Sequence, residues 1–238
     1  MDATTIDYVG DELALFESAL NWKQYLRRSL APHLSGDVAE VGAGLGATSK
    51  ALGNVAGVRS WTCIEPDPGM TSALREVVDS GSFTYPIDLH AGTLSDLPAA
   101  PAFDTIIYID VLEHIDNDRA EVEQAVARLR PGGRLVVLCP AYQFLYSPFD
   151  KAIGHYRRHT KSSLRNVAGD SLVEKAAFYM DSVGALASLA NKMALRQSMP
   201  TLGQVKFWDS MLVPVSKLID PLVLRAFGKS VVLVWTKA

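Results

Sequence analysis

The chain of 238 residues is poor in the features that mark several classes of protein. It has two cysteines, too few for the disulfide framework of a small secreted domain. Cys63 and Cys139 each lie in an apolar run, so we expect buried, reduced thiols. No basic segment followed by an apolar one stands near the N-terminus, and no apolar run reaches the ~18 to 20 residues of a membrane span. We therefore expect a soluble, cytoplasmic protein without stable membrane insertion.

The chain also lacks an excess of charge of one sign. Its formal net charge is −3, and it has no long Lys/Arg run, so we expect no nucleic-acid partner. The charge is unevenly distributed: residues 1–150 carry 10 Lys/Arg against 21 Asp/Glu, and residues 151–238 carry 13 against 5. A basic C-terminal part indicates either an anionic substrate or a solvated surface.

Apolar runs without polar alternation follow one another along the chain, separated by amphipathic segments. The expected strands are 37–41, 60–64, 87–91, 104–109, 134–139, 173–180 and 231–236. Helices are expected at 11–30, 47–54, 71–79, 118–130 and 161–168, with helical material at 183–197 and 205–225 and a loop at 141–158. This pattern predicts an α/β fold, a doubly wound and mostly parallel sheet within a single domain that spans residues 1–238.

A glycine-rich turn follows the first strand. Glu40 precedes glycines at 42, 44 and 46, and such a turn lets bare backbone approach a ligand. A dinucleotide site requires G-x-G-x-x-G/A, which Gly42, Gly44 and Ala47 satisfy. S-adenosylmethionine (SAM) instead leaves its amino-acid end beside the turn, where its ammonium would use Glu40. The turn alone is compatible with both cofactors.

Polar residues follow the other strands, at the edge where open α/β sheets bind ligands. Glu65, Pro66 and Asp67 come after the second strand, and Thr93 and Leu94 come after the third. A carboxylate such as Glu65 can accept both ribose hydroxyls, and its distance of 19 residues from Gly46 suits either cofactor. The fourth strand ends in the run from 110 to 116, which contains three acids and a histidine.

Taken together, these blocks resemble the class I SAM-dependent methyltransferases, in the small-molecule branch with V-L-E-H-I after strand four. The matching segments are E-V-G-A-G-L-G at 40–46, E-P at 65–66, 92–98, 103–115 with V-L-E-H-I at its end, and L-R-P-G-G-R-L at 129–135. They cover roughly residues 36–140, in the order of the family. The resemblance implies a seven-stranded sheet whose last strand, 231–236, is antiparallel, and it implies SAM as the cofactor.

The resemblance also implies the cofactor-binding residues. Glu40 and the backbone of Gly42, Gly44 and Gly46 would lie at the methionine end of SAM, with Asp110 nearby, and Glu65 would hold the ribose. Pro66 and Asp67 would lie beside the adenine, and Thr93 or the Leu94 backbone would contact its amino group. Thr93 departs from the family, which usually has an acid there.

The acceptor side is expected to come from a helical lid at 1–34 and from insertions within 141–238, around a SAM-binding core at 36–140. The candidate substrate residues are Tyr8, Trp22, Tyr142, Tyr146, Tyr156, Arg157 and Arg158. Two guanidiniums suit a phosphate or carboxylate, although they can also pair with acids of the first half. The expected acceptor is therefore an anionic small molecule with an apolar part, methylated in line.

A base is needed if the acceptor is a hydroxyl or an activated carbon. His155 is the first candidate, followed by Asp110 and His114. No metal site belongs to this interpretation. The apolar segment 178–212 suits either the apolar part of the acceptor or a homodimer interface.

Three alternatives stay open at this point. Asp110, Glu113, His114 and His155 could converge on a metal ion that assists O-methylation. The fold could instead serve a cyclase or a binding protein that does not methylate. The third alternative is a nicotinamide-dependent dehydrogenase.

Overall fold

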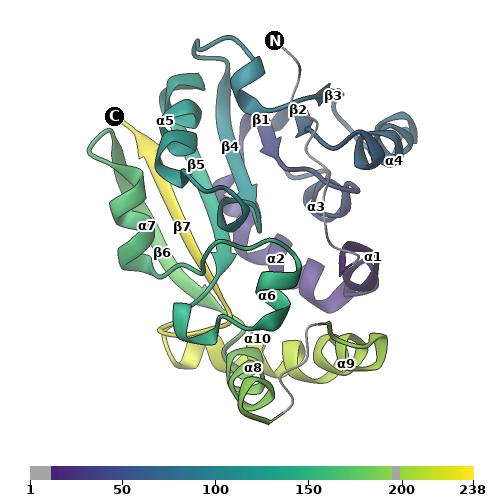
Figure 1. Cartoon of the computed structure of the whole chain (residues 1–238). Coiled ribbons are helices and arrows are strands. Elements are labelled where there is room, and N and C mark those ends of the chain that lie inside the picture. The colour runs from purple at the N-terminus through teal and green to yellow at the C-terminus, as the bar shows by residue number, and fades with distance from the viewer. Residues whose placement is uncertain (1–11, 195–198) are drawn as a thin grey trace.

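One sheet of seven strands forms the centre of the molecule (Figure 1). The computed structural model describes residues 12–194 and 199–238. The strands lie in the order β3-β2-β1-β4-β5-β7-β6, and β7 runs antiparallel to both of its neighbours. The predicted doubly wound sheet with an antiparallel last strand is thus confirmed. The strands are β1 Gly36–Val41, β2 Val58–Glu65, β3 Ile87–Ala91, β4 Phe103–Ile109, β5 Leu129–Pro140, β6 Leu172–Met180 and β7 Ser230–Lys237.

Helices cover both faces of the sheet and its carboxyl edge. They are α1 Glu12–Phe16, α2 Leu20–Leu30, α3 Ala47–Leu52, α4 Pro68–Asp79, α5 Asp118–Arg128, α6 Pro148–Ala152, α7 Lys161–Ala168, α8 Ser182–Ala194, α9 Leu202–Phe207 and α10 Val213–Leu222. A π-helical turn, Trp208–Leu212, joins the last two. No helix among the described residues is long and apolar enough to cross a bilayer.

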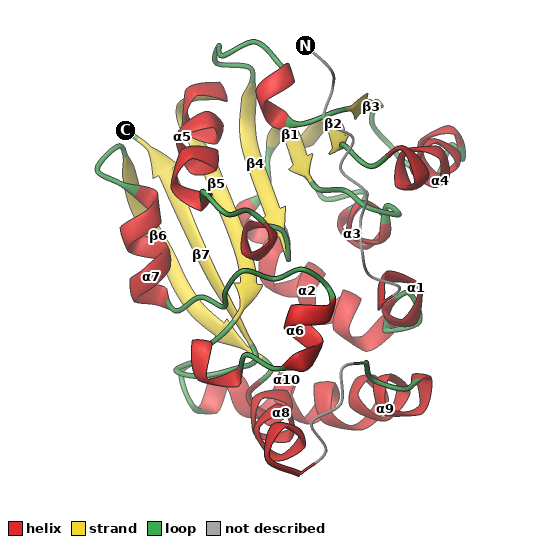
Figure 2. Ribbon diagram, in the orientation of Figure 1, coloured by secondary structure: helices red, strands yellow, loops and turns green. Residues whose placement is uncertain are grey.

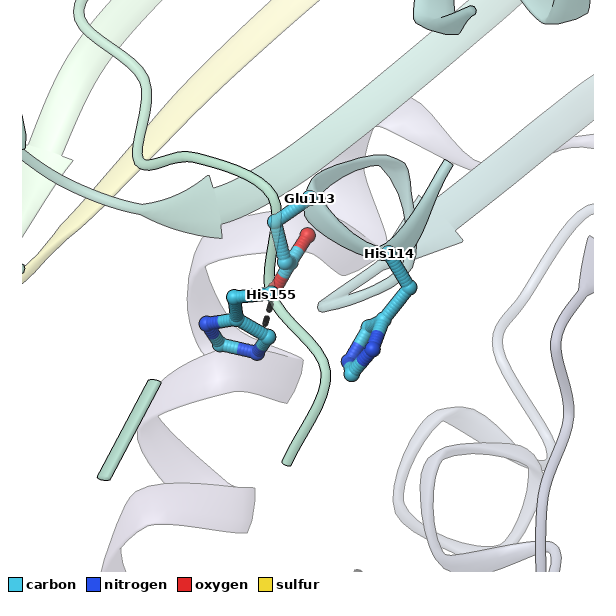
Figure 3. A group of neighbouring side chains, drawn as sticks. All are labelled: Glu113, His114 and His155. Carbon is cyan, nitrogen blue, oxygen red and sulfur yellow. Dashed lines mark ion pairs between the residues drawn. The ribbon is translucent and has the colours of Figure 1, made fainter. Parts of the chain in front are cut away.

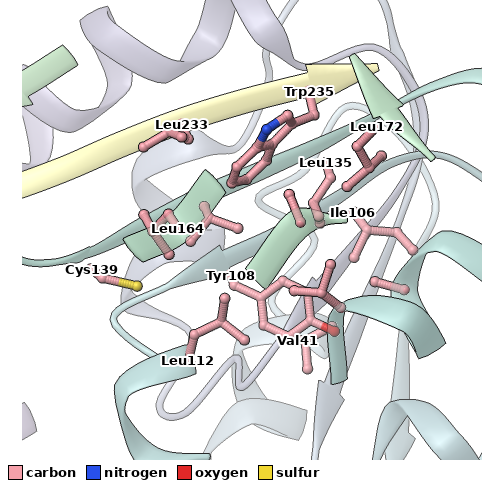
Figure 4. Packing of buried hydrophobic residues seen from close by; sticks show 14 of the residues in the cluster. Val41, Ile106, Tyr108, Leu112, Leu135, Cys139, Leu164, Leu172, Leu233 and Trp235 are labelled. Carbon is pink, nitrogen blue, oxygen red and sulfur yellow. The ribbon is translucent and has the colours of Figure 1, made fainter. Parts of the chain in front are cut away.

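The core lies on both faces of the sheet because successive side chains of a strand point to opposite sides. In β5, Leu135 and Val137 pack on the face covered by α5 and α7, whereas Val136 and Leu138 pack under α2, α3 and α10. Figure 4 shows the cluster on the first of these faces. Both cysteines are buried and free, as predicted. Burial on both faces explains why the strands lack polar alternation.

The prediction of one helix over 11–30 is wrong, because residues 17–19 interrupt it and separate α1 from α2. The new helix start at Leu20 exposes backbone N–H groups that have no partner within the helix. Asp209 is the partner of two of these groups, because its carboxylate accepts from the N–H of Asn21 at 3.1 Å and from that of Trp22 at 2.8 Å. A cap that lies 187 residues away leaves no local trace in the sequence.

The segment 141–158, expected as a loop, contains the short helix α6 and a 3₁₀ turn, Gln143–Leu145. Ser147 and Asp150 form a capping box at the start of α6, with the Ser147 N–H donating to Asp150 at 2.9 Å. Figure 2 shows α1, α2, α6 and α8–α10 gathered beyond the carboxyl ends of the parallel strands. This helical layer closes the edge where ligands are expected.

Candidate functional site

The glycine turn after β1 has a backbone that only glycine adopts without strain. Gly42 has a φ of +69° and Gly46 a φ of +76°. A Cβ on Gly42 would lie 2.6 Å from a methyl carbon of Val111, so the turn packs directly against the loop that follows β4. Space and dihedral angle therefore both require glycine at this position.

A cavity of about 460 Å³ lies over this turn, and we call it the glycine-turn cavity. Its walls come from the carboxyl ends of β1 to β4 and from α1 and α2. Among the residues predicted to bind the cofactor, those that line it are Gly42, Gly44, Glu65, Pro66, Asp67, Thr93, Leu94 and Asp110. Four strand ends that are distant in sequence thus meet in one cavity.

Glu65 is the most constrained acid of this cavity. Its side chain is buried, and its two oxygens accept from the N–H of Gly44 at 2.7 Å and from that of Asp67 at 2.9 Å. Burial raises the pKa of this carboxyl, and the two backbone N–H groups oppose the rise. Each oxygen keeps a second lone pair, so the carboxylate can accept two further hydrogen bonds in fixed directions.

Glu40 lies behind the turn and is not among the residues that line the cavity. It is 2% exposed and accepts hydrogen bonds from the Ser49 hydroxyl and from Trp61 Nε1 at 2.9 Å. Burial raises the pKa of Glu40 to about 7, against the effect of these two donors. The role predicted for Glu40 at the methionine end stays a prediction.

Glu40 makes the stability of the fold depend on pH. Because its pKa is higher in the folded chain, the folded state binds the proton more tightly, and stability falls as the pH rises from 4.5 to about 7. We expect the free energy of unfolding of the wild type to fall by up to about 3 kcal/mol more than that of Glu40→Gln between pH 4.5 and 8. Urea denaturation of both proteins across this range measures the difference, and parallel curves would contradict it.

Two capped turns form the part of the cavity where the adenine is predicted to lie. Asp67 begins α4, where its carboxylate accepts from the Met70 N–H at 3.0 Å. Thr93 begins the 3₁₀ turn Leu94–Asp96, and its hydroxyl donates to Asp96 at 2.8 Å. The Thr93 hydroxyl is thus engaged by the Asp96 carboxylate. Position 93 is the one at which the resemblance to the family predicts an acid.

Asp110 follows β4 with a φ of +55°, and its side chain is exposed to the glycine-turn cavity. Desolvation by the surrounding protein raises the pKa of Asp110 to about 6, and the positive charges of His155, Lys229 and Arg158 oppose this rise. His114 also lines the cavity, and burial followed by the charge of His155 lowers its pKa to about 3. Asp110 and His114 are thus the two predicted catalytic residues that reach the cavity.

The third predicted catalytic residue, His155, is buried behind His114, and the two rings stand edge to face at 4.5 Å. His155 lines neither this cavity nor the second one described below. Its Nδ1 lies 2.9 Å from Asp150 Oδ1, and its Nε2 lies 3.9 Å from Glu113 Oε1 (Figure 3). His155 is therefore directed at two carboxylates rather than at open space.

A second cavity, the lid cavity, lies among α6, α8, α9 and the π-helical turn and encloses about 270 Å³. Phe16 lines both cavities, so they are adjacent. The walls are mainly apolar, and their cationic residues are Arg158, Lys192 and Lys229. The ammonium of Lys229 lies 4.4 Å from the centre of a Trp208 ring. Among the described residues, no carboxylate forms an ion pair with Lys229.

The predicted substrate residues are spread more widely than expected. Trp22 lines the glycine-turn cavity and Arg158 the lid cavity. The remaining described ones line neither: Tyr142 stacks on Tyr179, Tyr146 donates to the His155 carbonyl, Tyr156 is exposed, and Arg157 pairs with Asp118 at 2.8 Å. Tyr8 lies outside the described residues.

Both arginines are paired within the chain. Arg157 pairs with Asp116 and Asp118 of the first half, and Arg158 donates to both oxygens of Asp150 in its own segment. The sequence left two roles open for these arginines, binding an anionic acceptor or pairing with acids of the chain, and the structure shows the pairing. Whether either guanidinium contacts an acceptor stays a prediction.

Sequence reasoning missed Lys229. This residue immediately precedes β7, and its carbonyl accepts from the Ala141 N–H at 2.7 Å, at the carboxyl end of β5. An antiparallel strand starts at the edge where its parallel neighbours end. The predicted antiparallel last strand could therefore have pointed to the residues just before it.

Comparison with known proteins decides between the cofactors. Residues 39–135 match the family model described as methyltransferase domain, a range that contains the glycine turn, Glu65 and the loop after β4. Residues 39–135 thus form a methyltransferase domain, in agreement with the resemblance to the class I SAM-dependent methyltransferases. SAM is the cofactor of this domain. The alternative of a nicotinamide-dependent dehydrogenase is therefore rejected, because the glycine turn lies within the range that matches the methyltransferase model. No curated protein matches the chain.

Solved structures share the fold of the methyltransferase domain and its surroundings. A Haloferax volcanii protein in complex with the Trm112 methyltransferase activator has 14% identity and a TM-score of 0.63, over 95% of this chain and 94% of that one. The N-methyltransferase NodS from Bradyrhizobium japonicum has 16% identity and a TM-score of 0.54, over 95% and 98%. Phosphoethanolamine N-methyltransferase 2 of Haemonchus contortus, in complex with SAM, has 13% identity and a TM-score of 0.63, over 95% and 57%.

Proposed function

We propose that this enzyme transfers the methyl group of SAM to a small molecule that carries an anionic group and an apolar part. The observation that carries the proposal is the adjacency of the two cavities at Phe16. One contains the glycine turn and the buried acid Glu65. The other is mainly apolar, and Lys229 in its wall forms no ion pair with a carboxylate of the described residues. In-line transfer needs the donor and the acceptor in adjacent sites from which water is excluded.

The cofactor would occupy the glycine-turn cavity. Glu65 offers two oriented oxygens to the ribose hydroxyls, and the turn at 42–46 offers bare backbone to the methionine end. Thr93 and Leu94 would lie beside the adenine. The acidic character of residues 1–150 also favours a cofactor with a sulfonium and an ammonium.

The acceptor would occupy the lid cavity. Its apolar walls suit a hydrocarbon part, and Lys229 suits a phosphate or carboxylate because no carboxylate of the described chain neutralises it. Burial lowers the pKa of Lys229, and an anion bound beside it would restore the charged form. The acceptor named for the Haemonchus relative likewise carries a phosphate.

A proton leaves the acceptor if its nucleophile is a hydroxyl or an activated carbon. Asp110 and His114 are the side chains we propose for accepting it, because both face the cofactor cavity. The pKa of Asp110, raised to about 6, lies closer to neutral pH than that of an ordinary aspartate, which makes it the stronger base of the two. His155 would act through His114 rather than on the acceptor itself.

Radiolabelled SAM and a metabolite extract fractionated by charge test the class of acceptor. We expect the label to appear in anionic molecules that partition partly into an organic phase. Label recovered only in neutral products would contradict the anionic acceptor.

Replacing Lys229 with methionine tests the acceptor site within the same assay. We expect the initial rate at limiting acceptor to fall by about 10- to 100-fold, which corresponds to one lost charge-assisted hydrogen bond. The dissociation constant of SAM should not change, since Lys229 does not line the glycine-turn cavity. Lys151→Met, at an exposed position, is the matched control and should behave like the wild type.

A further inference from the structure

Glu113, His114 and His155 form a cluster beside the glycine-turn cavity, and with Asp110 as the proton acceptor methyl transfer requires none of the three. One ligand atom from each lies within 4.8 Å of the others. Glu113 and His114 belong to the 3₁₀ turn after β4, whereas His155 arrives from the segment after α6 (Figure 3). The fold therefore brings together one carboxylate and two imidazoles from two distant segments.

The Glu113 carboxylate has no partner that would explain its burial. It is 0% exposed, and neither of its oxygens has a hydrogen-bond partner among the described residues. The Cys139 thiol lies close to the Glu113 carboxylate, and a thiol is only a weak hydrogen-bond donor. A buried carboxylate without compensation is strongly unfavourable, and when His155 is neutral none of the described residues supplies Glu113 with a positive charge.

His155 is oriented as a metal-binding histidine is. Its Nδ1 lies 2.9 Å from Asp150 Oδ1, and Arg158 and Ser147 hold that carboxylate in turn. With the proton on Nδ1, the lone pair of Nε2 faces Glu113, as in the carboxylate–histidine–metal arrangement of many metal centres. The 3.9 Å from Nε2 to Glu113 Oε1 is too long for a hydrogen bond. It is close to the separation of about 3.4 Å between two ligands of one tetrahedral ion.

We propose that Glu113, His114 and His155 bind one divalent transition-metal ion. Two imidazoles and one carboxylate suit zinc, cobalt, iron or manganese better than magnesium or calcium, which prefer oxygen ligands alone. His114 is half-buried and lines the cofactor cavity, so the positions left open on the ion face that cavity. Water or an oxygen of the acceptor would fill them, and the ion would lower the pKa of a bound hydroxyl.

Metal titration tests this proposal without SAM or an acceptor, so its result is independent of the proposed function. The protein is first treated with a chelator and then titrated with Co²⁺ and Zn²⁺, followed by calorimetry and, for Co²⁺, by visible absorption. We expect one ion per chain and a Co²⁺ spectrum of low coordination number. Glu113→Gln, His114→Gln and His155→Gln should each weaken binding by about 100-fold or more.

His159→Gln is the matched control, since His159 is also buried and lies 3.7 Å from a carboxylate, that of Asp118. It should bind the ions as the wild type does. His114→Gln keeps the test decisive if the two more buried variants do not fold, because His114 stands at the cavity wall. Absence of stoichiometric binding in the wild type would overturn the proposal, as expected if His155 is instead an imidazolium held between Asp150 and Glu113. Unchanged affinity in a folded His114→Gln variant would overturn it as well.

Discussion

Replacing Glu65 with glutamine should raise the dissociation constant of SAM by about 100-fold or more. When the carboxylate becomes an amide, one of the two charge-assisted hydrogen bonds from the ribose diol, worth about 1.5 to 3 kcal/mol, is lost, and the other remains only as a weaker, neutral hydrogen bond. The amide also directs an NH₂ group at the backbone N–H of Gly44 or Asp67, which now donate to Glu65. Two donors would then face each other in a buried place.

Isothermal titration with SAM measures this effect directly. Glu17→Gln is the matched control, because Glu17 is an exposed acid in the wall of the same cavity. It removes the same charge, so its affinity for SAM should stay close to that of the wild type. Similar losses in both variants would mean that the general negative potential, and not Glu65, holds the cofactor.

Replacing Asp220 with alanine should lower the free energy of unfolding by about 3 to 5 kcal/mol. Asp220 is 0% exposed, and its carboxylate accepts from the Tyr25 hydroxyl at 2.6 Å and from the N–H groups of Asp181 at 2.7 Å and Ser182 at 3.1 Å. It thus joins α2, the start of α8 and α10. Its loss leaves three donors unpaired in the helical layer that closes both cavities.

Urea denaturation at neutral pH measures this loss. Asp170→Ala, at an exposed position after α7, is the control and should change stability by no more than about 0.5 kcal/mol. A loss below about 1 kcal/mol for Asp220→Ala would mean that water replaces the carboxylate, and that the helical layer does not depend on it.

The sheet could be predicted because its strands are apolar on both faces. The runs at 104–109 and 134–139 correspond to β4 and to most of β5, whose side chains alternate between two buried clusters. The break between α1 and α2 could not be predicted, since the apolar positions of both helices continue the same pattern. The cap from Asp209 that stabilises the break depends on the tertiary fold.

The glycine-turn cavity could be predicted for a similar reason. Its residues follow strands of known order, and parallel strands deliver their carboxyl ends to one edge. The acceptor side was harder, because helices and loops from three parts of the chain build the lid cavity. Adjacent arginines in the sequence indicated an anion site, yet Asp150 and Asp118 already neutralise them. Lys229, which forms no ion pair with a carboxylate among residues 12–194 and 199–238, is a single cation just before the last strand.

A homodimer through the segment 178–212 stays a prediction. The division into a single domain with a lid at 1–34 also stays a prediction.

The intact glycine turn and the oriented Glu65 carboxylate argue against the alternative of a protein that does not methylate. The labelling experiment with SAM decides it, because a protein that only binds the cofactor transfers no label.

A crystal structure with S-adenosylhomocysteine tests the central claim most directly, namely that the glycine-turn cavity holds the cofactor. We expect both ribose hydroxyls within hydrogen-bonding distance of the Glu65 carboxylate, the adenine beside Thr93 and Leu94, and the sulfur directed toward Phe16 and the lid cavity. A nucleoside bound outside this cavity, or one whose ribose does not contact Glu65, would contradict the account.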